Sequence, residues 1–315
     1  MNTKQERIRK GNLPERYFSG KDLEMGQAIY KEDRMTIEKL IKVEHFNVNG
    51  RGYKKLEGKM ESHDYPDPNR FTYLGYAVLI GATDAARKLL DLGANINLVS
   101  IDAADALCSN INMACDNRNK KMVLLLLQYH VNLNPPLCGS PVEVLLYGDA
   151  DRDLIDLLLK NGADINYQAY GDGDMAILTA FEIGKLDYVN YFLDKGANPT
   201  ILDYFGNSFA LLLQEAIWEA RMDDSGLKEC NKIKDRLISQ YHIKFPVKKE
   251  MRIGIKMGIE RYENLSQADK DLLGENEKER IQELRDSLAK GATITGLSID
   301  SIEDASMQPP TNYKE

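Results

Sequence analysis

The sequence has few cysteines, histidines and tryptophans, and it lacks any long apolar run. Its 315 residues include four cysteines, four histidines and one tryptophan. No two cysteines form a C-x-x-C pair, so the sequence predicts neither a disulfide framework nor a metal cluster, and we interpret all four as small core residues. The longest aliphatic run, Met122 to Leu127, is far shorter than the roughly 20 apolar residues of a membrane-spanning helix. No transmembrane segment is therefore predicted.

The sequence also lacks an excess of basic residues. Its 41 Lys and Arg residues are outnumbered by 49 Asp and Glu residues, which gives a net charge of −8. Because a nucleic-acid partner requires a basic face, we expect no nucleic-acid binding. Residues 1–20 are locally basic, but no apolar stretch follows them, so no secretory signal peptide is predicted. We therefore expect a cytoplasmic location, with a periplasmic location as the alternative if a leader has been removed.

The most informative feature of the sequence is an internal repeat. The segment LLDLGANIN at 89–97 recurs as LLKNGADIN at 158–166 and FLDKGANPT at 192–200, with a weaker copy, LLQYHVNLN, at 126–134. The equivalent positions are Gly93, His130, Gly162 and Gly196, spaced by 37, 32 and 34 residues. This period is typical of helical solenoids, in which neighbouring helix pairs must stack to bury a continuous core.

A shorter apolar helix is predicted before each copy. The segment TYLGYA at 72–77 leads to Gly81, and MAILTA at 175–180 leads to Gly184; in both units the next glycine corner follows twelve residues later. Glycine just past a helix end adopts the left-handed conformation, and a following Asn or Asp turns the chain. Each unit is thus predicted to be a helix, a tight turn, a second helix and an extended finger.

These units resemble ankyrin repeats, whose pattern is T-P-L-H-x-A-A near the start and L-L-x-x-G-A-D/N-x-N near the end. The match is good at 72–97, 140–166 and 175–200, and it is degenerate at 106–134, where His130 replaces the glycine. No unit has the histidine of the T-P-L-H turn. The resemblance implies a scaffold that binds another protein through its fingers and first helices.

We therefore expect an all-α fold, an ankyrin-repeat solenoid with irregular capping units at both ends. The expected segments are a basic N-terminal segment at 1–20, a capping helix pair at 21–50, ankyrin repeats at 51–245, a C-terminal helical cap at 246–302 and a disordered tail at 303–315. Within the C-terminal cap, Ser266 is predicted to begin a charged helix that runs to Lys290 with one narrow apolar stripe.

No motif in the sequence predicts catalysis or a cofactor. The segment GDGDMA at 171–176 superficially resembles a dinucleotide fingerprint, but its two carboxylates would repel phosphate and no buried strand precedes it. The segment DADRD at 149–153 has the alternating carboxylates of a calcium loop without the glycine and glutamate that an EF-hand requires, and Asp151 and Asp153 suit a helix start better. We expect a chain that is not an enzyme and holds no metal and no cofactor.

Aromatic and acidic side chains of the predicted fingers and turns are the candidate contact residues. Tyrosine is a strong contact residue because it buries a large rigid face while its hydroxyl group stays hydrogen-bonded. The alternative is that these tyrosines pack against neighbouring fingers. The candidates for binding one protein partner are Tyr73, Asp102, Tyr167, Tyr170, Asp172, Asp174, Asp203, Tyr204 and Phe205.

A narrower resemblance concerns the N-terminal region. The segments YFSGKDL at 17–23, QAIY at 27–30 and IEKLI at 37–41 are similar to bacterial ankyrin proteins paired with secreted antibacterial toxins. The resemblance implies an immunity protein that occludes a cognate toxin, for which type VI lipase effectors are frequent examples. The alternative is an ankyrin adaptor or stabiliser of an intracellular or periplasmic enzyme. The sequence leaves the identity of the partner and the oligomeric state open.

Overall fold

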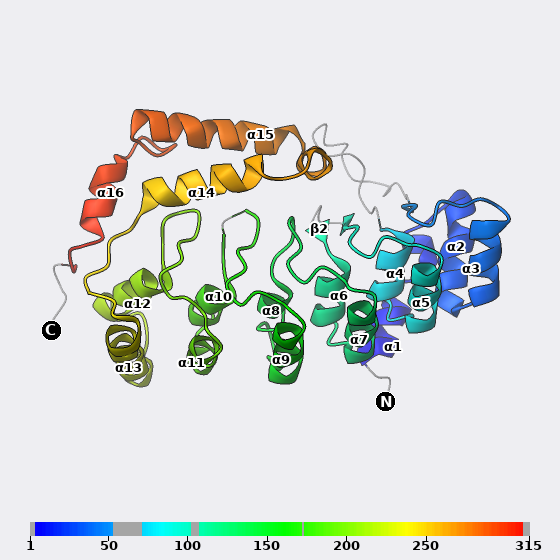
Figure 1. The fold of residues 1–315 in the computed structure, drawn as a ribbon, viewed down its shortest axis with the longest axis horizontal. Coiled ribbons are helices and arrows are strands. Elements are labelled where there is room, and N and C mark those ends of the chain that lie inside the picture. Colours follow the sequence, from blue (N-terminus) through cyan, green and yellow to red (C-terminus); the bar gives the residue numbers. More distant parts are fainter. Residues whose placement is uncertain (1–3, 53–70, 102–106, 172, 311–315) are drawn as a thin grey trace. The chain divides into compact units, whose positions relative to one another are not determined.

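The computed structural model describes residues 4–52, 71–101, 107–171 and 173–310, and the chain divides into two compact units, Met1–Ala163 and Asp164–Glu315. The described residues are mainly helical (Figure 1). Unit 1 contains α1 (Lys4–Gly11), η1 (Pro14–Arg16), α2 (Gly20–Lys31), α3 (Arg34–Lys42), α4 (Tyr73–Leu79), α5 (Thr83–Asp91), β1 (Ser100–Ile101), β2 (Leu107–Cys108), α6 (Asn110–Asp116), α7 (Lys120–Gln128), α8 (Pro141–Val144) and α9 (Arg152–Lys160). Unit 2 contains α10 (Ala176–Glu182), α11 (Leu186–Asp194), α12 (Phe209–Trp218), α13 (Asp224–Tyr241), α14 (Met251–Glu263), α15 (Gln267–Lys290) and α16 (Ile299–Ala305).

The helices occur in pairs, as the sequence predicts. The pairs α4/α5, α6/α7 and α10/α11 each join a helix of seven residues to one of nine. A hydroxyl group begins several first helices: the side chains of Thr72, Ser109 and Ser208 accept hydrogen bonds from backbone N–H groups three residues later. These caps satisfy helix N-terminal donors and fix where the helices start.

The corners that end the second helices share one geometry. Gly93, Gly162 and Gly196 have φ values of 92°, 101° and 93°. The next residue donates a backbone hydrogen bond of 2.9–3.0 Å to the carbonyl four positions before the glycine in all three cases. His130 stands at the same corner with φ 56°, and Val131 makes the equivalent bond of 3.2 Å. The sequence prediction that these positions are structurally equivalent is confirmed, including at the degenerate unit.

A ladder of asparagine side chains joins consecutive fingers inside each unit. In unit 1, Asn49 Oδ1 accepts from the backbone N–H of Asn95 at 2.7 Å, and Asn97 Oδ1 accepts from that of Asn132 at 2.9 Å. In unit 2, Asn166 Oδ1 accepts from the backbone N–H of Asn198 at 2.7 Å. We call this set the asparagine ladder. It sets the register of stacking, and it includes the finger that follows α3.

An aromatic cluster forms the core at the N-terminal end of unit 1. Five ring pairs in this cluster have centroids 4.9–6.5 Å apart, and they involve Tyr17, Phe18, Phe71, Tyr73 and Tyr76. The N-terminal segment at 1–20, predicted only to be basic, contains the helices α1 and η1. The hydroxyl group of Tyr76 donates to the carbonyl oxygen of Asn12 at 2.8 Å, which ties this segment to α4.

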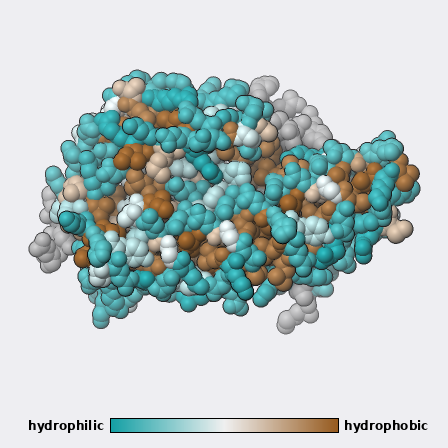
Figure 2. All heavy atoms as spheres, viewed as in Figure 1, coloured by the Kyte–Doolittle hydropathy of each residue, from teal (hydrophilic) through white to brown (hydrophobic). Residues whose placement is uncertain are grey.

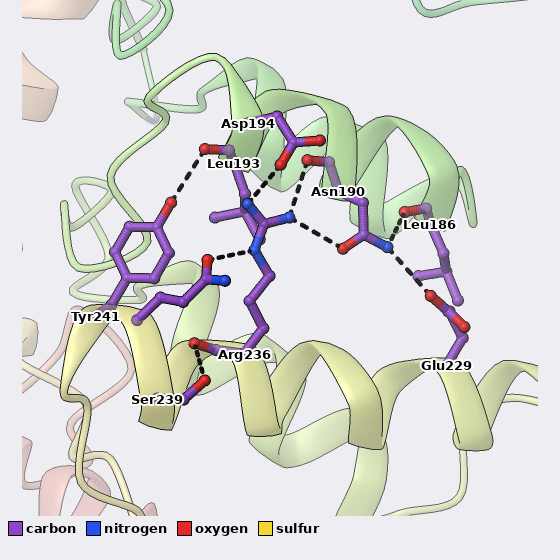
Figure 3. A network of polar contacts seen from close by, with 9 residues as sticks. Leu186, Asn190, Leu193, Asp194, Glu229, Arg236, Ser239 and Tyr241 are labelled. Carbon is purple, nitrogen blue, oxygen red and sulfur yellow. Dashed lines mark hydrogen bonds and ion pairs between the residues drawn. The ribbon is translucent and has the colours of Figure 1, made fainter.

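In unit 2, the second helices α11 and α13 are joined by a polar network centred on Arg236 (Figure 3). The Arg236 guanidinium donates to Asp194 Oδ1 at 2.7 Å and to the carbonyl oxygen of Asn190 at 3.2 Å. The Asn190 side chain donates in turn to Glu229 Oε1 at 3.1 Å, and the hydroxyl group of Tyr241 donates to the Leu193 carbonyl oxygen at 3.1 Å. This side of the stack is therefore held by polar contacts as well as by apolar packing.

Unit 2 ends with three helices, α14, α15 and α16. Figure 1 shows α14 and α15 lying side by side. Ser266 caps α15 as predicted, and α15 contains a non-helical break at Gly274. The prediction of a disordered tail at 303–315 is wrong for its first residues, because α16 continues to Ala305. Glu303 in this helix is buried, and its Oε1 accepts a hydrogen bond from the backbone N–H of Arg252 at 3.1 Å. Residues 311–315 lie outside the described residues.

Candidate protein-binding surface

The finger that precedes α12 is a tight hairpin held by one buried carboxylate. Leu202 and Ser208 form an antiparallel bridge at its base. Asp203 Oδ1 accepts from the backbone N–H groups of Phe205 and Asn207, both at 2.8 Å, while Oδ2 accepts from Asn207 Nδ2 at 2.7 Å. Burial raises the pKa of Asp203 above its ordinary value. These bonds fix the hairpin, and Phe205 is 53% exposed at its tip.

A second hairpin in the C-terminal cap has the same construction. Ala292 and Ser298 form the bridge at its base. The Thr293 N–H donates to the Leu297 carbonyl oxygen at 2.8 Å, the same length as the bond from Asp203 to Asn207 in the first hairpin. Gly206 and Gly296 stand at matching places with φ 81° and 85°. The chain therefore repeats a finger after α15, which the helix-to-finger ending at Lys290-Gly291-Ala292 foreshadows.

Helix α14 packs against the first hairpin through backbone contact. The N–H of Glu250 donates to the carbonyl oxygen of Gly206 at 2.9 Å. A Cβ atom on Gly254 would lie 2.8 Å from the Asp203 carbonyl oxygen and closer still to the backbone nitrogen of Gly206. Only glycine permits this approach, because real Cβ contacts below 3.0 Å essentially never occur. The finger side of unit 2 is thus partly covered by the chain itself.

Two finger tyrosines predicted to contact a partner contact α14 and α15 instead. Tyr167 is buried, its hydroxyl group accepts from Arg261 Nη2 at 3.1 Å, and its ring lies 5.7 Å from the guanidinium carbon. The hydroxyl group of Tyr170 donates to Glu277 Oε1 at 2.6 Å, and burial and this carboxylate raise the pKa of Tyr170 above its ordinary value. Both side chains are used in holding the C-terminal helices.

The remaining candidates lie in different environments. Tyr73 is 2% exposed and belongs to the aromatic cluster of unit 1, with its hydroxyl group bonded to Asp22. Tyr204 is half-buried against Gly173 and Gly258, and Asp174 is half-buried on the finger before α10. Asp102 and Asp172 lie outside the described residues. Phe205 alone among the described candidates is exposed.

The acidic motif at 149–153 marks the start of a helix. Asp151 accepts from the Leu154 N–H at 3.0 Å as the N-cap of α9, which agrees with the predicted helix start at this motif.

Within the described residues, no group of three or more His, Cys, Asp or Glu side chains is arranged to hold a metal ion. The described helices include none with the length and apolar character to cross a bilayer.

Sequence reasoning missed two features of this surface: α14 and the exposed residues of the second hairpin. Gly254 and Gly258 are spaced by one helical turn, which is the signal in the sequence for a close approach along one face of a helix. Ile294 and Leu297 are 64% and 61% exposed on the second hairpin. On the face seen in Figure 2, apolar residues likewise form patches within a mostly hydrophilic surface.

The comparisons with known proteins agree with the repeat geometry. No protein-family model matches the chain. The chain is 27% identical over 128 residues to a protein of Acanthamoeba polyphaga mimivirus named as a putative ankyrin repeat protein. The aligned region covers 40% of this chain and 68% of that protein. It is also similar to the crystal structure of the ankyrin repeat domain of Bcl-3, a member of the IκB family, with a TM-score of 0.51, 19% identity, and coverage of 69% of this chain and 87% of that one.

The fold is therefore that of an all-α ankyrin-repeat protein, which confirms the predicted fold class. The names of the two similar proteins say nothing about toxins or immunity.

Proposed function

We propose that the chain binds one protein partner without turnover and that the exposed tips of its fingers make the contact. The observation that carries this proposal is the geometry of Phe205. This large apolar residue is more than half exposed, yet its hairpin is fixed by three hydrogen bonds to the buried carboxylate of Asp203. A preorganised aromatic side chain binds at a low cost in conformational entropy, which is a property of interface anchors.

The contact set differs from the one that the sequence predicts. Tyr73 and Tyr167 are buried in the chain's own packing, and Tyr170 is bonded to α15. We propose Phe205 as the anchor, with the neighbouring half-buried Tyr204 at its margin. An anchor surrounded by less exposed groups that exclude water is the usual arrangement of a strong contact site.

Affinity capture with a pair of variants tests this proposal. The wild-type chain, Phe205→Ala and Ile238→Ala are used as bait in parallel; Ile238 is 45% exposed on α13, away from the fingers. A specific partner should be retained by the wild-type chain and by Ile238→Ala, and it should be lost or weakened at least about tenfold with Phe205→Ala. Equal capture by all three baits would contradict the proposal.

A finer proposal follows from the N-terminal resemblance. We propose that the partner is a secreted antibacterial toxin, a group that includes the type VI lipase effectors, and that the chain neutralises this toxin by occluding it. Its support is the similarity of the segments at 17–23, 27–30 and 37–41 to bacterial ankyrin immunity proteins. In the structure, these segments build α2, α3 and the aromatic cluster.

Co-expression with a toxin encoded beside this gene, in a sensitive bacterium, tests the finer proposal. Rescue of growth by the wild-type chain and loss of rescue with Phe205→Ala would support it. Absence of rescue would defeat the immunity role while leaving protein binding intact. A stable complex with an enzyme of the same cell, without any protective effect, would favour the adaptor alternative.

A further inference from the structure

Unit 2 contains a cavity that the repeat pattern does not predict. Its volume is about 200 Å³, and it lies between the first hairpin, α14, α15 and the second hairpin. The lining is almost wholly apolar and includes Tyr204, Ile255 and Leu284. Phe205 of the first hairpin and Ile294 of the second, both exposed, also line it.

The two hairpins hold the rim of this cavity in a defined geometry. Phe205 is 53% exposed and Ile294 is 64% exposed, although both touch the cavity. Their hairpins have matching bridges and matching 2.8 Å backbone bonds. Exposed apolar side chains gathered around an apolar cavity are a mark of a binding site, because water is a poor solvent for both.

The charge around the cavity indicates an uncharged occupant. Arg280, the charged residue of the lining, pairs with Glu277 at 2.7 Å. Arg252, next to Met251 of the lining, pairs with Asp300 at 2.7 Å. Because these guanidinium groups are already neutralised, a charged ligand would lose its hydration without gaining a counter-charge.

The volume of the cavity indicates the size of the occupant. A dry apolar cavity of about 150 Å³ accepts a single benzene ring, whereas pockets for whole small-molecule ligands measure roughly 300–1,000 Å³. A space of about 200 Å³ therefore suits one side chain better than a lipid or a cofactor.

We propose that this cavity is an anchor site that receives one uncharged, bulky apolar side chain, aromatic or branched aliphatic, from the protein partner. The proposal rests on the proposed protein-binding function and names the chemistry of the partner's contact residue. Phe205 and Ile294 pack around the base of the inserted side chain, and the cavity walls hold its end.

The test uses the full chain with labelled isoleucine and methionine methyl groups and N-acetyl-phenylalaninamide as the probe. Titration should shift the NMR signals of Ile255 and Met251 in a saturable way. Phe205→Ala and Ile294→Ala should each weaken probe binding by about fivefold to tenfold. Leu297→Ala is the matched control, because Leu297 is 61% exposed on the same hairpin as Ile294 and does not line the cavity; it should leave binding unchanged.

Three results of the probe titration would overturn the anchor proposal: no saturable shift at any soluble probe concentration, equal weakening by Leu297→Ala, or tighter binding of dodecanoate than of the aromatic probe. The last result would identify a site for a free alkyl ligand. Partner capture that depends on Phe205 but is unaffected by Ile294→Ala would refute the anchor site and still support protein binding.

Discussion

Substitution of Gly254 by alanine tests whether α14 is held on the finger side of unit 2 by backbone contact. The new Cβ atom would lie 2.8 Å from the Asp203 carbonyl oxygen and closer to the backbone of Gly206. Since backbone cannot rotate away as a side chain does, the overpacking should cost about 1–3 kcal/mol. Displacement also weakens the Glu250 to Gly206 hydrogen bond, worth about 1 kcal/mol, while alanine gains about 1 kcal/mol in helix propensity.

The expected net effect is a loss of about 1–3 kcal/mol in the docking free energy of α14. Hydrogen exchange measures it directly, because docked helices exchange through local opening. Amide exchange in α14 should become about 5-fold to 150-fold faster. Exchange in α10 and α11, which belong to the repeat stack of the same unit, should change much less.

Gly258→Ala is the matched control in the same helix. The three atoms nearest its Cβ atom would all belong to the Tyr204 side chain, the closest at 3.3 Å, and a side chain can shift slightly. The variant should be neutral or should stabilise α14 by up to about 1 kcal/mol. If Gly254→Ala and Gly258→Ala show the same exchange rates as the wild-type chain, the inferred backbone docking is wrong.

Three further predictions concern unit 1. Asn97→Ala removes a rung of the asparagine ladder, the acceptor for the Asn132 N–H, and should lower the free energy of unfolding by about 1 kcal/mol in denaturant titrations; an unchanged midpoint would contradict it. His130→Gly relieves the strain of a positive φ at a residue with a Cβ atom. It should raise the free energy of unfolding by about 0.5–1 kcal/mol in the same assay; a lower free energy of unfolding would contradict the inferred strain. Pairing with Lys42 and Lys88 lowers the pKa of Glu38 to about 2, so the stabilisation from this pairing is present above about pH 4.5, near the unfolded pKa. That stabilisation is lost as the pH falls towards 2, so the melting temperatures of wild type and Glu38→Gln should converge there; a constant difference between pH 6 and pH 2 would refute the pairing.

The repeat corners were predictable because each depends on a few adjacent residues. Glycine at a positive φ and Asn or Asp after it determine the geometry locally, so Gly93, Gly162 and Gly196 could be aligned from sequence alone. The corner at His130 was harder, since a residue with a Cβ atom adopts the same conformation only when its neighbours impose it.

The docking of α14 was not predictable, because it depends on contacts between residues far apart in sequence. Arg261 meets Tyr167 and Glu277 meets Tyr170 across separations of 94 and 107 residues. A tyrosine that bonds the chain's own helix has the same local sequence signature as one that contacts a partner: an amphipathic ring at a turn. The sequence therefore identified tyrosines that make specific contacts but could not identify what they contact.

Because of the asparagine ladder, the alignment of the repeats is independent of the side chains that the fingers display. Its rungs connect a side-chain amide to a main-chain N–H, so the alignment of neighbouring modules does not depend on the side chains displayed at the finger ends. Evolution can therefore exchange those displayed side chains to suit a new target while the spacing between modules stays fixed. Engineers grafting altered loops onto this chain should keep Asn49, Asn97 and Asn166 and vary the residues beyond them.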